Sequence, residues 1–137
     1  MNKIFRFFLF MTMVFTISFS AMKDGSYSVE GKAAGGWQPF MKMTVKNQKI
    51  IGVQYDRKNS NGQLLSLDQK GNEKFKEKNG MSFRDATFTL SRSLIKTQNI
   101  EDLENINVPE ATNEFKQLGR FLIEKANAGT EGNFTLD

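Results

Sequence analysis

The chain has 137 residues, a formal net charge of +4 and neither cysteine nor histidine. This length suits one globular domain. The absence of His and Cys excludes a Ser-His-Asp triad, a thiolate nucleophile and any zinc or haem site built from those ligands. No run of residues has the Asp/Asn spacing and closing Glu of a calcium loop, so the sequence predicts no metal site and no catalytic residue.

Residues 1–20 have the order of a secretory signal peptide. A basic start, "MNKIFR", precedes an apolar run and then small residues, with Ser18 and Ser20 at the spacing that signal peptidase reads. We predict cleavage after Ser20, which leaves residues 21–137 as a single domain that is secreted, periplasmic or on the cell surface. An uncleaved membrane anchor is the alternative, because the apolar run is only somewhat short for spanning a bilayer.

The charge of the mature chain excludes one class of partner. Residues 1–20 contain two basic and no acidic residues, so 19 basic groups become 17 against 15 acidic ones, a net charge of +2. Such a small excess, spread along a domain, gives no electrostatic footprint for DNA or RNA. We therefore expect no nucleic-acid partner, and no stable membrane insertion once the signal is cleaved.

The first half of the mature chain predicts strands. The segment "KDGSYSVEGK" alternates Tyr27 and Val29 with small polar residues, which is typical of a strand with one buried face. Residues 39–56 predict a β-hairpin, because alternating apolar residues stand on both sides of a polar turn near Asn47 and Gln48. These segments should form the sheet.

The next segment, residues 57–80, combines a loop with a weak helical pattern. Its start is rich in polar residues and glycine, which marks an exposed connection. Leu67, Gly71 and Phe75 then share one side of a helix that Gly80 ends.

Stronger helical patterns follow. Ser82 and Asp85 have the spacing of a capping box, and apolar residues recur at helical intervals, which predicts a helix over 82–97. A final helix over 110–127 has a clear apolar stripe, and Gly129 ends it. The tail is either loose or a short added strand. We predict an α+β domain in which a small antiparallel sheet, built on the hairpin, is packed by two or three helices.

Four blocks of the mature chain occur in a characteristic order. They read "DGSYSVEGK", "GGWQPFMKMTVKNQKIIGVQYDRKNSNGQLLS", "NEKFKEKNGMSFRD" and "VPEATNEFKQLGRFLIEKANAG". In this order they resemble the FMN-binding domains of secreted bacterial flavoproteins, notably the surface lipoproteins used in extracellular electron transfer. The resemblance covers essentially the whole mature chain, and it implies one FMN-binding-like domain.

The resemblance also implies an attachment point for the cofactor. In that family a Ser-Gly-Ala-Thr type motif opens the last helix, and a flavin transferase joins FMN through its phosphate to the threonine hydroxyl. Ala111 and Thr112 match the end of this motif, whereas Pro109 and Glu110 replace its serine and glycine, and Ile106 stands where the family usually has aspartate. Glu110 would add a side chain and a negative charge beside the phosphate.

Thr112 has a second interpretation from the residues alone. Its hydroxyl can cap the final helix, with Pro109 and Glu110 as favourable first-turn residues. A helix N-terminus also favours a phosphate, through unpaired backbone N–H groups and the positive end of the helix dipole. Both interpretations use the same hydroxyl.

Trp37, the only tryptophan, follows Gly36 in the block "AAGGW". A flavin ring could stack on it. The alternative is a core or rim tryptophan beside a glycine turn. The resemblance thus implies that Thr112, Ala111, Trp37 and Gly36 bind FMN.

The sequence leaves two functions open. The first is an extracytoplasmic FMN-binding, electron-transfer protein, a carrier rather than a catalyst, whose partners are a flavin transferase and redox proteins. The second is a secreted or surface binding module that keeps the fold but has lost the flavin, as Pro109 and Glu110 suggest.

Overall fold

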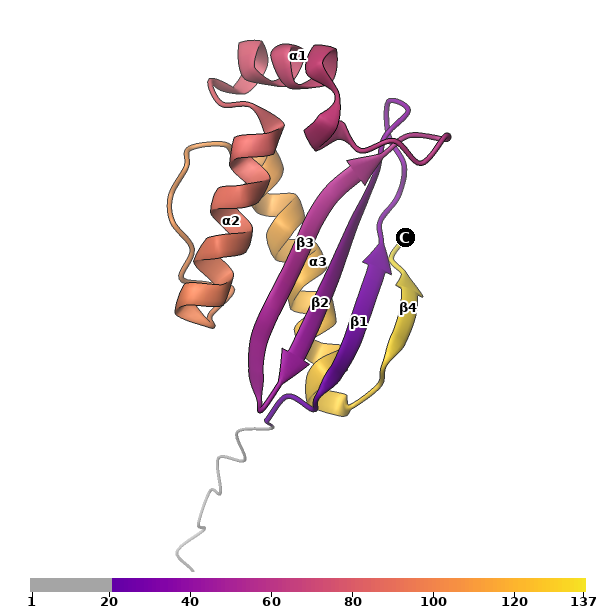
Figure 1. The fold of residues 1–137 in the computed structure, drawn as a ribbon, viewed down its shortest axis with the longest axis vertical. Helices are drawn as coiled ribbons and strands as arrows, with labels where there is room; N and C mark the ends of the chain where they lie inside the picture. Colours follow the sequence, from indigo (N-terminus) through magenta and orange to yellow (C-terminus); the bar gives the residue numbers. More distant parts are fainter. Residues whose placement is uncertain (1–20) are drawn as a thin grey trace, which may run out of the picture.

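The computed structural model of the protein describes residues 21–137, and the predicted signal peptide over 1–20 lies outside this range. The domain combines one four-stranded sheet with helices, as expected for an α+β protein (Figure 1). Its elements are, in chain order, β1 (Gly25–Glu30), β2 (Gln38–Lys46), β3 (Lys49–Lys58), a short 3-10 helix η1 (Leu65–Leu67), α1 (Gln69–Asn79), α2 (Phe83–Thr97), α3 (Pro109–Ala128) and β4 (Gly132–Thr135).

The sheet is mixed, with strand order β3-β2-β1-β4. The pairs β1–β2 and β2–β3 are antiparallel, as predicted, whereas β4 runs parallel to β1. The tail is therefore an added strand. Its direction follows from α3, which ends at the lower end of the sheet in Figure 1, where β1 also begins, so the chain enters β4 from the same end as β1.

The predicted hairpin turn is confirmed. Asn47 and Gln48 both have left-handed backbone angles, with φ of 52° and 64°, which suits the tight two-residue turns that match strand twist. Beyond the turn, the pairing shifts between Thr44 and Val45, because β3 contains one extra residue, Ile51. This bulge leaves Ile51 on the surface, 53% exposed.

Local signals set the helix ends. Ser82 caps α2 by accepting a hydrogen bond from the Asp85 backbone N–H (3.1 Å), and Gly80 ends α1 with φ of 80°. The predicted apolar side of α1 is wrong for Leu67, which is 74% exposed. Asp68 has extended backbone between η1 and α1, so Leu67 is out of helical register with Phe75.

One core joins the sheet to the helices. Tyr55 makes edge-to-face contacts with Phe83 and Phe115, at centroid distances of 5.6 and 5.5 Å, and so connects β3 to α2 and α3. Gly119 lets α3 pack closely, because a Cβ there would meet the Ile100 side chain at 2.6 Å. Packing of this kind fixes where the first turn of α3 lies.

Candidate functional site

The first turn of α3 carries the residues for which the sequence predicts a cofactor. The helix begins at Pro109, its N-cap is Val108, and no side chain makes a capping hydrogen bond. The predicted capping role of Thr112 is therefore wrong. Pro109 has the preset φ that suits the first helical position, so the N-cap is Val108, four residues before Thr112. The Thr112 backbone N–H already donates to the Val108 carbonyl (3.0 Å).

Ala111 and Thr112 have different surroundings. Ala111 is fully buried, while Thr112 is half-buried. Ala111 therefore packs in the core and presents nothing to a ligand. Of this matched pair, only the Thr112 side chain reaches solvent, which is what attachment of a group to its hydroxyl would need.

Two glutamates one turn apart dominate the charges at this end of α3. The Glu114 carboxylate accepts hydrogen bonds from Arg57 Nε (2.8 Å) and from the Tyr55 hydroxyl (2.5 Å). Glu110 pairs with Arg57 Nη1 (3.2 Å) and with Lys78 Nζ (3.3 Å). We call these five residues the α3 ion network. It joins β3, α1 and α3.

The pKa values reflect this arrangement. Burial, followed by the nearby Glu114 carboxylate, raises the pKa of Tyr55 well above its ordinary value of 10.0. Burial alone would raise the pKa of Glu110, but hydrogen bonds from Lys78 and Arg57 outweigh it and lower that pKa. Tyr55 is therefore neutral and Glu110 ionised at neutral pH.

The α3 ion network bears directly on phosphate binding. Arg57 and Lys78 are cations that contact the first turn of α3, and the Glu110 carboxylate neutralises both. Glu110 is also an acidic residue in the first turn, where it complements the helix dipole. A side-chain anion thus already occupies the position that would attract the phosphate of FMN, and this turn does not fit that phosphate as it stands.

Gly36 and Trp37 belong to a tight turn between β1 and β2. Ala34 and Trp37 exchange backbone hydrogen bonds (2.9 and 3.1 Å), and Gly35 and Gly36 between them have φ of 60° and 83°. Turns of this kind require left-handed residues at both central positions, which explains the glycines. Trp37 is half-buried and packs against the core. The structure therefore gives both residues a turn and packing role.

Trp37 and Thr112 lie toward the same end of the sheet. Trp37 precedes Gln38, which pairs with Lys58 at the end of β3, next to Arg57 of the α3 ion network. Within residues 21–137, however, no hydrogen bond joins Trp37 to Thr112 or Ala111. The binding of FMN by Thr112, Ala111, Trp37 and Gly36 stays a prediction.

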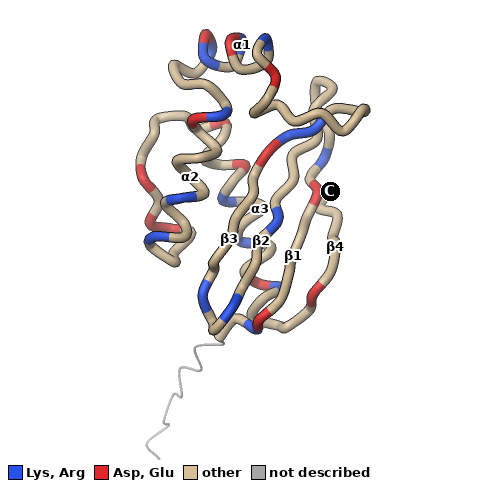
Figure 2. Tube along the Cα trace, in the orientation of Figure 1, with Lys and Arg blue, Asp and Glu red and all other residues tan. Residues whose placement is uncertain are grey.

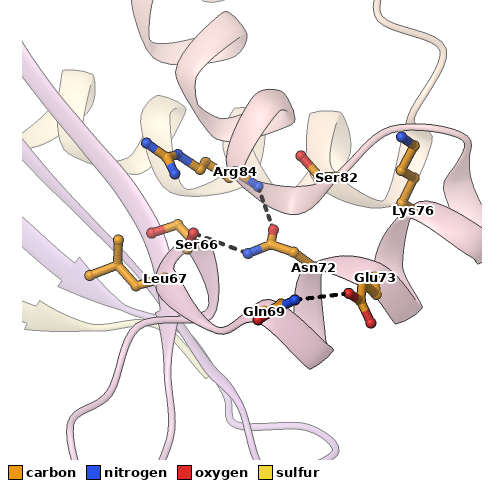
Figure 3. A pocket seen from close by; sticks show the side chains of 8 residues that line it. All are labelled: Ser66, Leu67, Gln69, Asn72, Glu73, Lys76, Ser82 and Arg84. Atoms are coloured by element: carbon orange, nitrogen blue, oxygen red, sulfur yellow. Dashed lines mark hydrogen bonds between the residues drawn. The ribbon is translucent and has the colours of Figure 1, made fainter.

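A separate hollow of about 370 Å³ lies between η1, α1 and the start of α2 (Figure 3). The Asn72 side chain crosses it, donating to the Ser66 carbonyl (3.0 Å) and accepting from the Arg84 backbone N–H (2.9 Å). Gln69 donates to Glu73 (3.3 Å) on the same rim. The Asn72 bonds hold α1 against η1 and α2. The Ser66 hydroxyl bonds to Asp56 and the Ser82 hydroxyl to the Asp85 backbone N–H, so neither is bonded to the Glu73 or Lys76 side chain that also lines the hollow.

Charges are mixed over the surface. Figure 2 shows Lys and Arg interspersed with Asp and Glu along α1, α2 and the sheet, rather than gathered on one face. Among residues 21–137 no group of three or more acidic side chains is placed to hold a metal ion. Across the same residues, no helix is both long and apolar enough to cross a bilayer.

A pair of substitutions tests the helix caps. Ser82→Ala should lower the free energy of unfolding by about 1 kcal/mol, because Ser82 caps α2. Thr112→Ala should change it by less than about 0.5 kcal/mol, because Thr112 caps nothing. Urea unfolding monitored by circular dichroism measures both. A Thr112→Ala loss as large as that of Ser82→Ala would restore the capping interpretation.

The known proteins that are similar to this chain have names that state no ligand and no reaction. No family model matches the chain. The chain is 26% identical over 115 residues to the 15 kDa lipoprotein of Treponema pallidum (strain Nichols), covering 82% of each protein. The crystal structure of the CPE2226 protein of Clostridium perfringens aligns with a TM-score of 0.76 and 25% identity, over 85% of this chain and 99% of that one.

A solution NMR structure of a Clostridium thermocellum protein aligns less closely, with a TM-score of 0.50 and 21% identity over 77% of this chain and 92% of that one. This match shows the fold alone. None of the three names specifies a ligand or a reaction. The function of this chain must therefore be inferred from its own residues.

Sequence reasoning missed the α3 ion network. The sequence predicted Glu110 as a neighbour of a phosphate or as a favourable first-turn residue, and it indicated no role for Arg57, Lys78 or Glu114. The available signal was the spacing of Glu110 and Glu114, which puts two carboxylates on one face of the last helix. Their cationic partners come from β3 and α1, and no sequence pattern joins those segments.

Proposed function

We propose that this protein is an extracytoplasmic binding or interaction domain in which the flavin-attachment position is closed. One observation carries the proposal: the Glu110 carboxylate occupies the first turn of α3 and pairs with Arg57 and Lys78. A phosphate brought to Thr112 would have to displace these contacts and would lie beside a like charge. The domain therefore acts through its surface rather than through a covalent cofactor.

The location is supported by two independent features. The order of basic, apolar and small residues over 1–20 is that of a secretory signal. The Treponema pallidum relative is called a lipoprotein. This chain has no cysteine, so it cannot carry a lipid on a cysteine, and secretion or retention through residues 1–20 are the remaining routes.

FMN binding with electron transfer is the second candidate. The half-exposed position of Thr112 on the first turn of α3 favours it, as does a tryptophan near the same end of the sheet. The flavin would supply the redox chemistry, and a flavin transferase and redox proteins would be the partners. This candidate requires Glu110 to release Arg57 and Lys78.

The intact mass of the native protein tests the proposal. Mature protein purified from its own host, or coexpressed with the host's flavin transferase, should be colourless and have the mass of the unmodified chain. Flavin absorbance together with an added mass of one FMN, lost in Thr112→Ala and kept at least partly in Thr112→Ser, would replace the first proposal by the second.

A double substitution separates a closed site from an absent one. Pro109→Ser with Glu110→Gly removes the carboxylate and restores the family-like residues. Lys78 Nζ and Arg57 Nη1 then become available to a phosphate, while Arg57 Nε stays bonded to Glu114. Covalent flavin in this variant, but not in the wild type, is the expected result with an active transferase. If neither carries flavin, the position has no latent competence for it, and the closure by Glu110 is not what prevents attachment.

A further inference from the structure

Exposed apolar side chains gather beside α2. Within residues 21–137 the exposed large hydrophobic residues are Ile51, Leu67, Phe88 and Ile95. Phe88 and Ile95 line one hollow of about 560 Å³ together with Val53 of β3, and Ile51 belongs to the same strand. An apolar group of this kind, on a domain that otherwise has a mixed polar surface, is typical of an interaction site.

The free edge of β3 is not the accessible part of this surface. The Gln98 side chain accepts from the Ile50 backbone N–H (2.8 Å) and donates to the Ile50 carbonyl (2.8 Å), as a neighbouring strand would. Further along, the Thr87 hydroxyl donates to the Tyr55 carbonyl. Because Thr87 of α2 and Gln98, its C-cap, bond the edge in this way, a partner meets the outer face of α2 rather than adding a strand to the sheet.

That outer face has a regular pattern. Asp85, Phe88, Arg92 and Ile95 are all exposed and follow one another at intervals of three, four and three residues, so they form one stripe along α2. Arg84 lies over the Phe88 ring at 5.7 Å. None of the ion pairs within residues 21–137 uses Asp85, Arg92 or Lys96, so their charges remain available to a partner.

We infer that this stripe binds a second copy of the chain, with the two α2 helices antiparallel about a two-fold axis that crosses the stripe midway between Phe88 and Arg92. In that register Phe88 lies opposite the partner subunit's Arg92, and Asp85 lies opposite the partner subunit's Ile95 and Lys96. The Phe88–Arg92 cation–π contact and the Asp85–Lys96 ion pair each occur twice, once on either side of the axis. This is the self-complementarity that a two-fold interface needs.

The charges select the antiparallel arrangement. Parallel α2 helices would place Asp85 against the partner's Asp85 and Arg92 against the partner's Arg92, which is repulsive. Ser91, a small residue close to the axis, permits close approach of the two helices.

The dimer is independent of whether the α3 ion network excludes flavin.

Sedimentation equilibrium of the mature domain, residues 21–137, tests the dimer. The wild type should self-associate reversibly, and Phe88→Ser should raise the dissociation constant by about tenfold or more, as expected for a central aromatic contact. Leu67→Ser, which removes an apolar side chain outside the stripe that is even more exposed than Phe88 (74% against 57%), should leave the constant unchanged. A wild type that is monomeric up to about 1 mM would overturn the inference.

Charge reversal tests the register. Asp85→Lys should weaken the dimer by about tenfold, and adding Lys96→Glu should restore it, because the two changes recreate the pair across the axis. The native chain has no cysteine, so Ser91→Cys should give a disulfide-linked dimer on mild oxidation, whereas Lys42→Cys on the sheet should not. Failure of the double charge variant to recover, or equal cross-linking by both cysteines, would refute this arrangement.

Discussion

Replacing Phe83 by alanine is expected to lower the free energy of unfolding by about 4 kcal/mol, because the substitution leaves a cavity where a fully buried ring was. The Phe83 ring makes edge-to-face contacts with Tyr55 at 5.6 Å and with Phe75 at 5.3 Å. The Arg57 guanidinium lies over the same ring at 5.1 Å. One truncation thus removes packing from α1, α2 and β3 together. Urea unfolding monitored by circular dichroism measures the loss.

Phe88 is the matched control on the same helix. It is 57% exposed, so Phe88→Ala should change the free energy of unfolding of the monomer by less than about 0.5 kcal/mol. The measurement is made at low protein concentration, where self-association contributes nothing to stability. Equal losses for Phe83→Ala and Phe88→Ala would show that burial does not distinguish the two sides of α2.

Replacing Arg57 by methionine is expected to cost about 3 kcal/mol. The Arg57 side chain is only 13% exposed, and it is hydrogen-bonded to Glu114, whose side chain is 22% exposed. Its removal leaves two carboxylates facing each other without their shared cation, beside the neutral Tyr55 hydroxyl. Methionine keeps much of the apolar stem, so the loss reports mainly on the charge. Urea unfolding at neutral pH measures it.

Arg120 provides the comparison. It pairs with Glu101 through two hydrogen bonds (2.6 and 2.7 Å), yet both side chains are more than half exposed. Arg120→Met should therefore cost less than about 1 kcal/mol. If Arg57→Met costs no more than Arg120→Met, the α3 ion network does not fix the first turn of α3, and the closure of the flavin position by Glu110 loses its support.

The stability losses expected for Phe83→Ala and Arg57→Met both bear on how the start of α3 is held. Arg57 lies over the Phe83 ring and also binds Glu110 and Glu114, so the aromatic core and the ion network are parts of one assembly. That assembly holds the start of α3 in place. Variants that loosen it should also free Lys78 and the first turn of α3, which connects stability to the availability of the Thr112 hydroxyl.

Local signals in the sequence were sufficient for most of the secondary structure. Alternation of Tyr27 and Val29 with small polar residues predicted β1, and Asn47 and Gln48 at the hairpin turn adopt the left-handed angles that such a turn needs. Ser82 and Gly129 mark helix ends where they were expected. These features depend on a few neighbouring residues, so a short stretch of sequence contains all the information that determines them.

Features that depend on distant segments could not be predicted in the same way. The parallel pairing of β4 with β1 depends on where α3 delivers the chain, and the exposure of Leu67 depends on the break at Asp68. By itself the sequence determined that an Ala-Thr pair lies near the start of the last helix of an α+β domain. Only the tertiary structure decided what surrounds Thr112, because Arg57 of β3 and Lys78 of α1 reach Glu110 across the fold, and pairing across the fold leaves no local pattern in the chain.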